Sequence, residues 1–189
     1  MSASKKPTFR RIAVYAAVLA VFWRASPTPI LFASGAVLAL AGEALRIWAC
    51  GHLRKNQAVI QSGPYAHVKN PLYLGTFLIM VGCLVAATNP DNSSRYLLLL
   101  ALPFSLGVFF VYYLPYKFAR EGDRLRRRFG EEWESYAEAV PDFVPRLTPF
   151  SRSDVRWNAQ LVAENSEVSA AVWLVLALAV LAIQIVLGV

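Results

Sequence analysis

The sequence predicts an all-α integral membrane protein with about five transmembrane helices and a cytosolic amphipathic helix. The 189-residue chain is 57% hydrophobic, with a mean hydropathy of +0.44. Its apolar runs approach roughly 20 residues, the length of helix that spans a bilayer. No alternation of strands and helices interrupts them. These observations exclude an ordinary soluble domain.

Four long apolar runs predict four spans. They are residues 30–50, 72–88, 96–114 and 168–189. A fifth run, 12–23, is shorter and follows basic residues, as a signal peptide also would. The Pro27-Thr28-Pro29 turn and the apolar run directly after it favour a helical hairpin instead. Pro103 should kink the span in which it lies.

The distribution of positive charge predicts the orientation. With a cytosolic N-terminus, the N-terminal tail and the loops 51–71 and 115–167 lie inside and carry four, three and nine of the 19 Lys and Arg residues. Such a bias is typical of cytosolic loops. It explains the net charge of +7 without a nucleic-acid partner. The partner expected is the lipid bilayer, either a bacterial inner membrane or the endoplasmic reticulum of a eukaryote.

Residues 117–139 predict an amphipathic helix at the cytosolic interface. Apolar side chains such as Phe118, Leu125 and Trp133 recur at helical spacing, and arginines and glutamates fill much of the remainder. Gly130 is a candidate break. The bland alternative is a surface helix that only anchors the protein. Residues 146–167 are expected to form a linker with some helical content.

Two polar modules adjoin the apolar runs and carry the candidate chemistry. The first module, residues 63–75, reads GPYAHVKNPLYLG, and the second, residues 121–145, contains Phe129-Gly130, Trp133, Tyr136 and the run VPDFVP. Neither a G-x-G-x-x-G dinucleotide loop nor a G-x-S-x-G elbow is present. Cys50, His52, His67 and Cys83 do not match an ordinary zinc spacing, so no metal site is expected.

Both modules resemble the isoprenylcysteine carboxyl methyltransferase family and related phospholipid methyltransferases. The first is similar to the family's G-P-Y-x-x-x-R-H-P-x-Y-x-G signature, and the second to its E-E…F-G-x-x-Y-x-x-Y…V-P-R-F-I-P tail. The chain differs at Lys69-Asn70, Gly122 and Asp142. The resemblance implies a single membrane methyltransferase domain over 1–189, with a family-like core at 43–146 and an additional helix at 168–189.

The resemblance also implies S-adenosylmethionine as cofactor and an active site that faces the cytosol. The cofactor-binding residues carried over by position are Gln57, Ala58, Val59, Ile60, Tyr65, Asn70, Pro71, Leu72, Tyr73 and Glu121. A carboxylate such as Glu121 suits an ammonium group, and tyrosine rings suit a cation. The alternatives are an interfacial aromatic belt for Tyr65 and Tyr73, and a solvated helix charge for Glu121.

Three further residues are candidates for catalysis. Lys117 falls where the family has a basic residue on the substrate side, and Glu43 and Arg46 lie three residues apart within an apolar run. Ionisable groups at such depth suggest function by default, although the two could simply neutralise each other. Arg46 would attract an anionic substrate group that Glu43 orients. His52 and His67 are more typical of loop residues than of bases.

The function expected is carboxyl O-methylation of a prenylated or other amphiphilic substrate that enters from the bilayer. A carboxylate acceptor needs no general base, and the sequence offers no dedicated one. The first alternative is methylation of a phospholipid amine or a thiol. A membrane reductase and a non-enzymatic scaffold are the remaining alternatives. The oligomeric state is left open.

Overall fold

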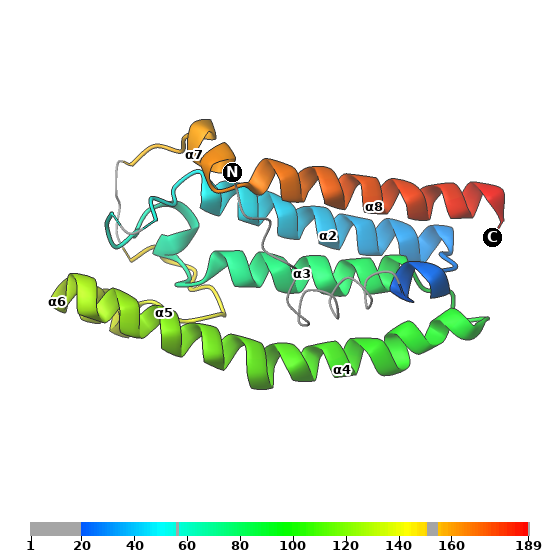
Figure 1. Ribbon diagram of the computed structural model, residues 1–189, viewed down its shortest axis with the longest axis horizontal. Coiled ribbons are helices and arrows are strands. Elements are labelled where there is room, and N and C mark those ends of the chain that lie inside the picture. Colours follow the sequence, from blue (N-terminus) through cyan, green and yellow to red (C-terminus); the bar gives the residue numbers. More distant parts are fainter. Residues whose placement is uncertain (1–19, 56, 151–154, 189) are drawn as a thin grey trace, which may run out of the picture.

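The computed structural model describes residues 20–55, 57–150 and 155–188, and every regular element in these ranges is helical. The long helices run side by side, and the loops of both polar modules gather at one end (Figure 1). In chain order the helices are α2 (Pro29–Cys50), η1 (Gly63–Ala66), α3 (Pro71–Ala86), η2 (Ser93–Arg95), η3 (Leu97–Ala101), α4 (Leu102–Gly107), η4 (Val108–Tyr113), α5 (Leu114–Phe129), α6 (Glu131–Ala139), α7 (Ala159–Glu164) and α8 (Glu167–Leu187).

Within the described ranges, three helices are long and apolar enough to cross a membrane. They are α2, the continuous helix Ser93–Phe129, and α8. The structure therefore supports an all-α membrane protein but not the predicted count of five spans. The expected span 72–88 is α3, whose 16 residues extend about 24 Å, less than the roughly 30 Å of a bilayer core. Most of the expected span 12–23 lies outside the described residues.

Glycines allow α2 and α3 to approach each other closely. A Cβ on Gly35 would lie 2.4 Å from the Gly82 carbonyl oxygen, and a Cβ on Gly42 would lie 2.7 Å from that of Gly75. Each helix places its two glycines seven residues apart, on one face. In a membrane, where lipid competes for apolar side chains, such close backbone contact is a main source of helix association.

The helix Ser93–Phe129 changes its winding ahead of each proline. The π-helical stretches η3 and η4 directly precede Leu102-Pro103 and Leu114-Pro115. Proline lacks an N–H and its ring collides with the carbonyl four residues earlier, so a wider turn relieves both problems. One continuous helix thus includes the expected span 96–114 and the first part of the expected amphipathic helix 117–139. The helix ends where Gly130 adopts a φ of 52° before α6.

The close packing of α2 on α3 predicts a sharp difference between two glycines. In Gly82→Ala the new methyl group would meet Ala39 N at 2.5 Å, whereas at Gly107 nothing lies within 4 Å. Gly82→Ala should therefore lower the free energy of unfolding by about 1–3 kcal/mol. Gly107→Ala should leave it unchanged or slightly higher. Thermal unfolding in detergent measures both, and equal stability of the two variants would refute the close contact.

Candidate functional site

Backbone hydrogen bonds at the start of α3 join the first polar module to the second module and to the residues directly after it. Lys69 N donates to Pro141 O at 2.9 Å, and Arg146 N donates to His67 O at 2.9 Å. Phe150 N donates to Ala66 O at 2.8 Å. The two modules, far apart in the sequence, therefore form one structural unit.

An apolar cluster packs against this unit. Val59, Tyr136 and Val140 are buried together, with Trp133 and Phe150 packed against them. The Tyr136 hydroxyl donates to Tyr65 O at 2.8 Å. Burial raises the pKa of Tyr136, so its hydroxyl stays protonated and able to donate. The cluster fixes α6 against the loop that precedes η1.

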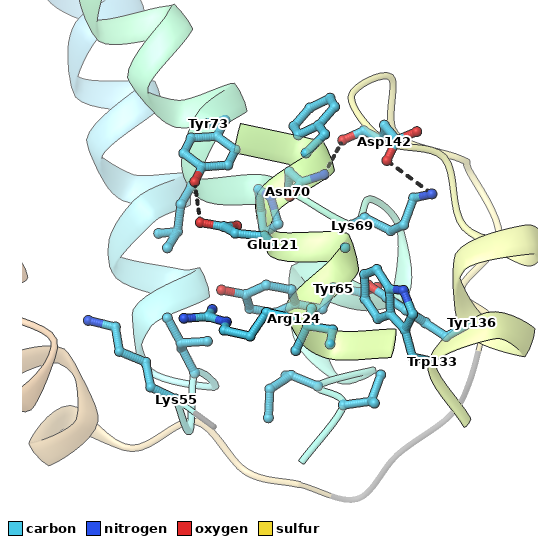
Figure 2. A pocket seen from close by; sticks show the side chains of 18 of the residues that line it. Lys55, Tyr65, Lys69, Asn70, Tyr73, Glu121, Arg124, Trp133, Tyr136 and Asp142 are labelled. Carbon is cyan, nitrogen blue, oxygen red and sulfur yellow. Dashed lines mark hydrogen bonds and ion pairs between the residues drawn. The ribbon is translucent and has the colours of Figure 1, made fainter. Parts of the chain in front are cut away.

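Two residues at which the chain differs from the resembled motif form an ion pair with each other. The Lys69 Nζ lies 3.0 Å from Asp142 Oδ1 and also donates to Ala137 O. Asn70 Nδ2 donates to Asp142 O at 3.1 Å. Asp142 therefore clamps the start of α3 and is not a free charge. Figure 2 shows both contacts at the upper edge of the pocket.

A pocket of about 330 Å³ opens between the two modules. Its walls come from the loop 53–60, the start of α3, α5 and α6, and Figure 2 shows its side chains. Nine of the ten predicted cofactor residues line it: Ala58, Val59, Ile60, Tyr65, Asn70, Pro71, Leu72, Tyr73 and Glu121. The structure therefore brings these residues together, while their roles stay predictions.

Tyr73, Glu121 and Tyr65 give the pocket its polar interior. The Tyr73 hydroxyl donates to Glu121 Oε1 at 2.6 Å. The Tyr65 hydroxyl is buried and has no hydrogen-bond partner. Burial raises the pKa of Tyr65 well above its usual value, so the hydroxyl is neutral at physiological pH. A buried hydroxyl without a partner is unfavourable, and a bound polar group would satisfy it.

Cationic side chains form the outer edge of the pocket. Arg54, Lys55 and Arg124 are exposed lining residues, and Lys69 lies farther in. In Figure 2 the Lys55 and Arg124 side chains lie on the side opposite the clamp made by Asp142. The site thus combines an acidic and aromatic interior with a basic rim. That arrangement suits a ligand with a positive end and a negative end.

Four predicted site residues do not line the pocket. Gln57 is exposed, and Lys117 Nζ lies 5.7 Å from the centre of the Tyr113 ring. Glu43 and Arg46 lie beyond the pocket, where Arg46 contacts Glu167 at the start of α8. Arg46 lies closer to Glu167 than to Glu43, since the shortest N–O distances are 2.5 Å and 3.8 Å, so both carboxyl groups lie beside this one guanidinium.

Several residues that line the pocket were not expected there from the sequence. Two of them, Trp133 and Tyr136, could have been predicted, because they belong to the second module and to the apolar face of residues 117–139. Nothing in the sequence indicated that Lys55, Arg124 and the Lys69–Asp142 ion pair would lie at the pocket. Their positions depend on how the loop 51–70 folds against α5 and α6.

His52 holds the loop before the first module and has no part in the pocket lining. Its ring is buried, and Nδ1 lies 3.1 Å from Ser62 Oγ. Burial lowers the pKa of His52, which keeps the imidazole neutral at physiological pH. A Cβ on Gly63, at a φ of 59°, would collide with this ring. His52 therefore belongs to the packing of the turn.

An aromatic cluster separates the pocket from the apolar ends of the helices. Phe143, from the VPDFVP run, packs against Phe77 of α3 and Phe109 and Phe110 of η4. Tyr73 continues the cluster through an edge contact with Tyr113, at a centroid distance of 5.7 Å. The second module thereby inserts a side chain between α3 and the helix Ser93–Phe129. In the ranges that the structure describes, no group of three or more His, Cys, Asp or Glu side chains is arranged to hold a metal ion.

Two curated relatives are similar to this chain. The cobalt-zinc-cadmium resistance protein CzcN of Cupriavidus metallidurans is 29% identical over 148 residues, which make up 77% of this chain and 63% of that protein. The nickel-cobalt-cadmium resistance protein NccN of Alcaligenes xylosoxydans xylosoxydans is 30% identical over 141 residues, 74% of this chain and 59% of that protein. The chain thus spans about three fifths of the relatives it matches. No family model and no solved structure matches.

These relatives contradict the assignment to the isoprenylcysteine carboxyl methyltransferase family. Both are named as metal resistance proteins and neither as a methyltransferase. The predicted enzyme activity, carboxyl O-methylation with its phospholipid and thiol alternatives, is therefore wrong. The short motifs of the two modules are turn, proline and aromatic residues that fold a loop against helices. Such residues describe a local structure that proteins of different function can share.

Proposed function

We propose that this protein is a membrane component of a system that confers resistance to divalent transition-metal cations. The observation that carries the proposal is its similarity to proteins named for resistance to cobalt, zinc, cadmium and nickel. The similarity covers about three quarters of this chain. The chain contributes through its pocket. In the described ranges its His, Cys, Asp and Glu side chains form no metal-binding group of three.

We propose that the protein crosses the membrane several times, with the pocket on the cytosolic side. The basic loops 51–71 and 115–167 support this orientation, because positive charge is retained in the cytosol. In this arrangement α3 crosses the membrane together with α2, the helix Ser93–Phe129 and α8. The arginine-rich end of α5 then lies at the headgroups, where anionic lipid attracts it. Because both named relatives are bacterial, the membrane proposed is a bacterial inner membrane.

The ligand that we propose for the pocket is a small organic molecule with a cationic end, an anionic end and a flat ring. Glu121, with Tyr73, would hold the cation, and the basic rim at Lys55 and Arg124 would hold the anion. The Tyr65 hydroxyl would gain the partner it lacks. S-adenosylmethionine, the molecule expected from the sequence, has this chemistry and serves as the probe. The proposal concerns binding alone.

Binding of S-adenosylmethionine to the detergent-purified protein tests the pocket. We expect saturable binding by calorimetry. Glu121→Gln should weaken it about 10-fold or more, because the charge-assisted contact with the cation is lost. Tyr65→Phe, which removes the hydroxyl without a partner, should weaken it less.

The control is Glu138→Gln, which neutralises an exposed glutamate of α6 outside the pocket and should bind like the wild type. Absence of binding by a folded, monodisperse wild type would eliminate this ligand. Equal binding by Glu121→Gln would remove Glu121 from the site.

Growth in the presence of metal tests the function. Expression in a metal-sensitive bacterial host should raise the tolerated concentration of Co²⁺, Zn²⁺, Cd²⁺ or Ni²⁺. Glu121→Gln should lose most of this gain, and Glu138→Gln should keep it. Immunoblots of the membrane fraction establish equal amounts of protein. Unchanged tolerance to all four cations despite normal membrane levels of wild type would contradict the proposed function.

A further inference from the structure

A buried ionic cluster lies between α2, α3 and α8, outside the pocket. Arg46 extends from α2 across Gly75 of α3, where an added Cβ would lie 2.4 Å from Arg46 Cγ. Its Nε and Nη2 donate to the two carboxylate oxygens of Glu167 at 2.5 and 2.9 Å. Its Nη1 donates to Thr76 Oγ1 at 2.7 Å. The guanidinium is therefore fully engaged, with Glu167 as its bidentate partner.

The turn between α7 and α8 fixes Glu167 in this position. Asn165 Nδ2 donates to the carbonyl oxygens of Cys50 and Leu53, at the end of α2. Ser166 then adopts a left-handed conformation, with a φ of 63°, and Glu167 begins α8. A serine in this region is strained by about 1–3 kcal/mol. The surrounding contacts must hold it there, and they direct Glu167 towards Arg46.

Glu43 is the second carboxyl group of the cluster, and its charge has no partner of its own. Glu43 is 5% exposed and Glu167 is 3% exposed. Glu43 Oε2 lies 3.8 Å from Arg46 Nε, a nitrogen that already donates to Glu167. Glu43 Oε1 is buried without any hydrogen-bond partner. Two carboxylates beside one guanidinium would leave a net negative charge away from water, which is strongly unfavourable.

We propose that Glu43 and Glu167 form a proton-binding site and share one proton at neutral pH. Both carboxyl groups lie beside Arg46 Nε, Glu167 Oε1 at 2.5 Å and Glu43 Oε2 at 3.8 Å. Two ionised carboxylates can only accept, so a hydrogen bond between them requires a proton. With the proton on Glu43, the three side chains sum to zero charge. The Arg46–Glu167 pair keeps its bidentate geometry.

The geometry favours a proton over a metal cation. Both oxygens of Glu167 are occupied by Arg46, and Cys50 Sγ donates to Oε2 at 3.5 Å. Glu43 Oε1 is then the one carboxylate oxygen of the cluster without a contact, and a divalent ion needs several oxygens. The other charged or titratable groups in contact with the pair are Arg46 and Cys50, both of α2. A thiol adds no charge at neutral pH.

Infrared spectroscopy of the wild-type protein in lipid or detergent tests this proposal. Exposed carboxyl groups are ionised at neutral pH, since their ordinary pKa values lie near about 4. The only buried acidic side chains in the described ranges are Glu43 and Glu167. We expect a carbonyl band of one protonated carboxylic acid per chain, which shifts in D₂O. Glu43→Gln should lose it, and the control Glu138→Gln should keep it.

Three results would overturn the proposal. One is a wild-type spectrum with only carboxylate bands at neutral pH. Another is a carboxylic acid band that survives in Glu43→Gln. The third is loss of the band in wild type on addition of equimolar Zn²⁺ or Co²⁺, which would identify a metal site. Thermal unfolding of Glu43→Gln checks that the variant folds. We expect wild-type stability, because a neutral amide replaces a neutral acid of the same shape.

Discussion

Arg46 is the contact on which the arrangement of the helices depends. It is a residue of α2, it lies over Gly75 and bonds Thr76 of α3, and it forms a bidentate pair with Glu167 of α8. Because a charge inside an apolar bundle is stable only when it is paired and hydrogen-bonded, these partners are obligatory. The glycine contacts bring α2 and α3 close enough for Arg46 to span both. α8 cannot shift along α2 without leaving a buried charge unpaired.

The pocket lies next to the helix ends that Arg46 holds together. The loop 51–70 leaves α2 directly after the Arg46 cluster and returns the chain to the start of α3. A loop near the membrane must pair its backbone groups within the protein. The VPDFVP run accepts from Lys69 N at Pro141 O and inserts Phe143 between the helices. Directly after this run, Arg146 N and Phe150 N donate to the carbonyl oxygens of His67 and Ala66. The side chains left facing the enclosed space are those of the pocket.

Much of this could be predicted from the sequence, because helices and motifs are local. The apolar runs 30–50 and 168–189 agree with α2 and α8 to within one to two residues at the ends. Nine of ten predicted cofactor residues line one pocket because each module folds as a unit. The long-range contacts could not be predicted in this way. Glu167 lies 121 residues from Arg46, and only the packing of α8 brings the two together. The apolar run 72–88 agrees with α3 equally well, although this helix is shorter than a bilayer core.

The functional prediction failed for a different reason. The modules describe how a loop is folded against two helices, and relatives named for metal resistance match about three quarters of the chain. A local motif constrains backbone shape and the enclosed space more strongly than it constrains the reaction. The pocket and the buried ionic cluster at Arg46 are therefore the features from which a function is proposed.

The free energy of unfolding of Glu167→Gln tests the central role of Arg46 most directly. The matched control is Glu164→Gln, which changes an exposed glutamate of α7. Loss of the Glu167 charge removes the bidentate partner of the part-buried Arg46, and we expect a decrease of about 1–3 kcal/mol. The control should change by less than about 0.5 kcal/mol. Equal stability of the two variants would contradict the account.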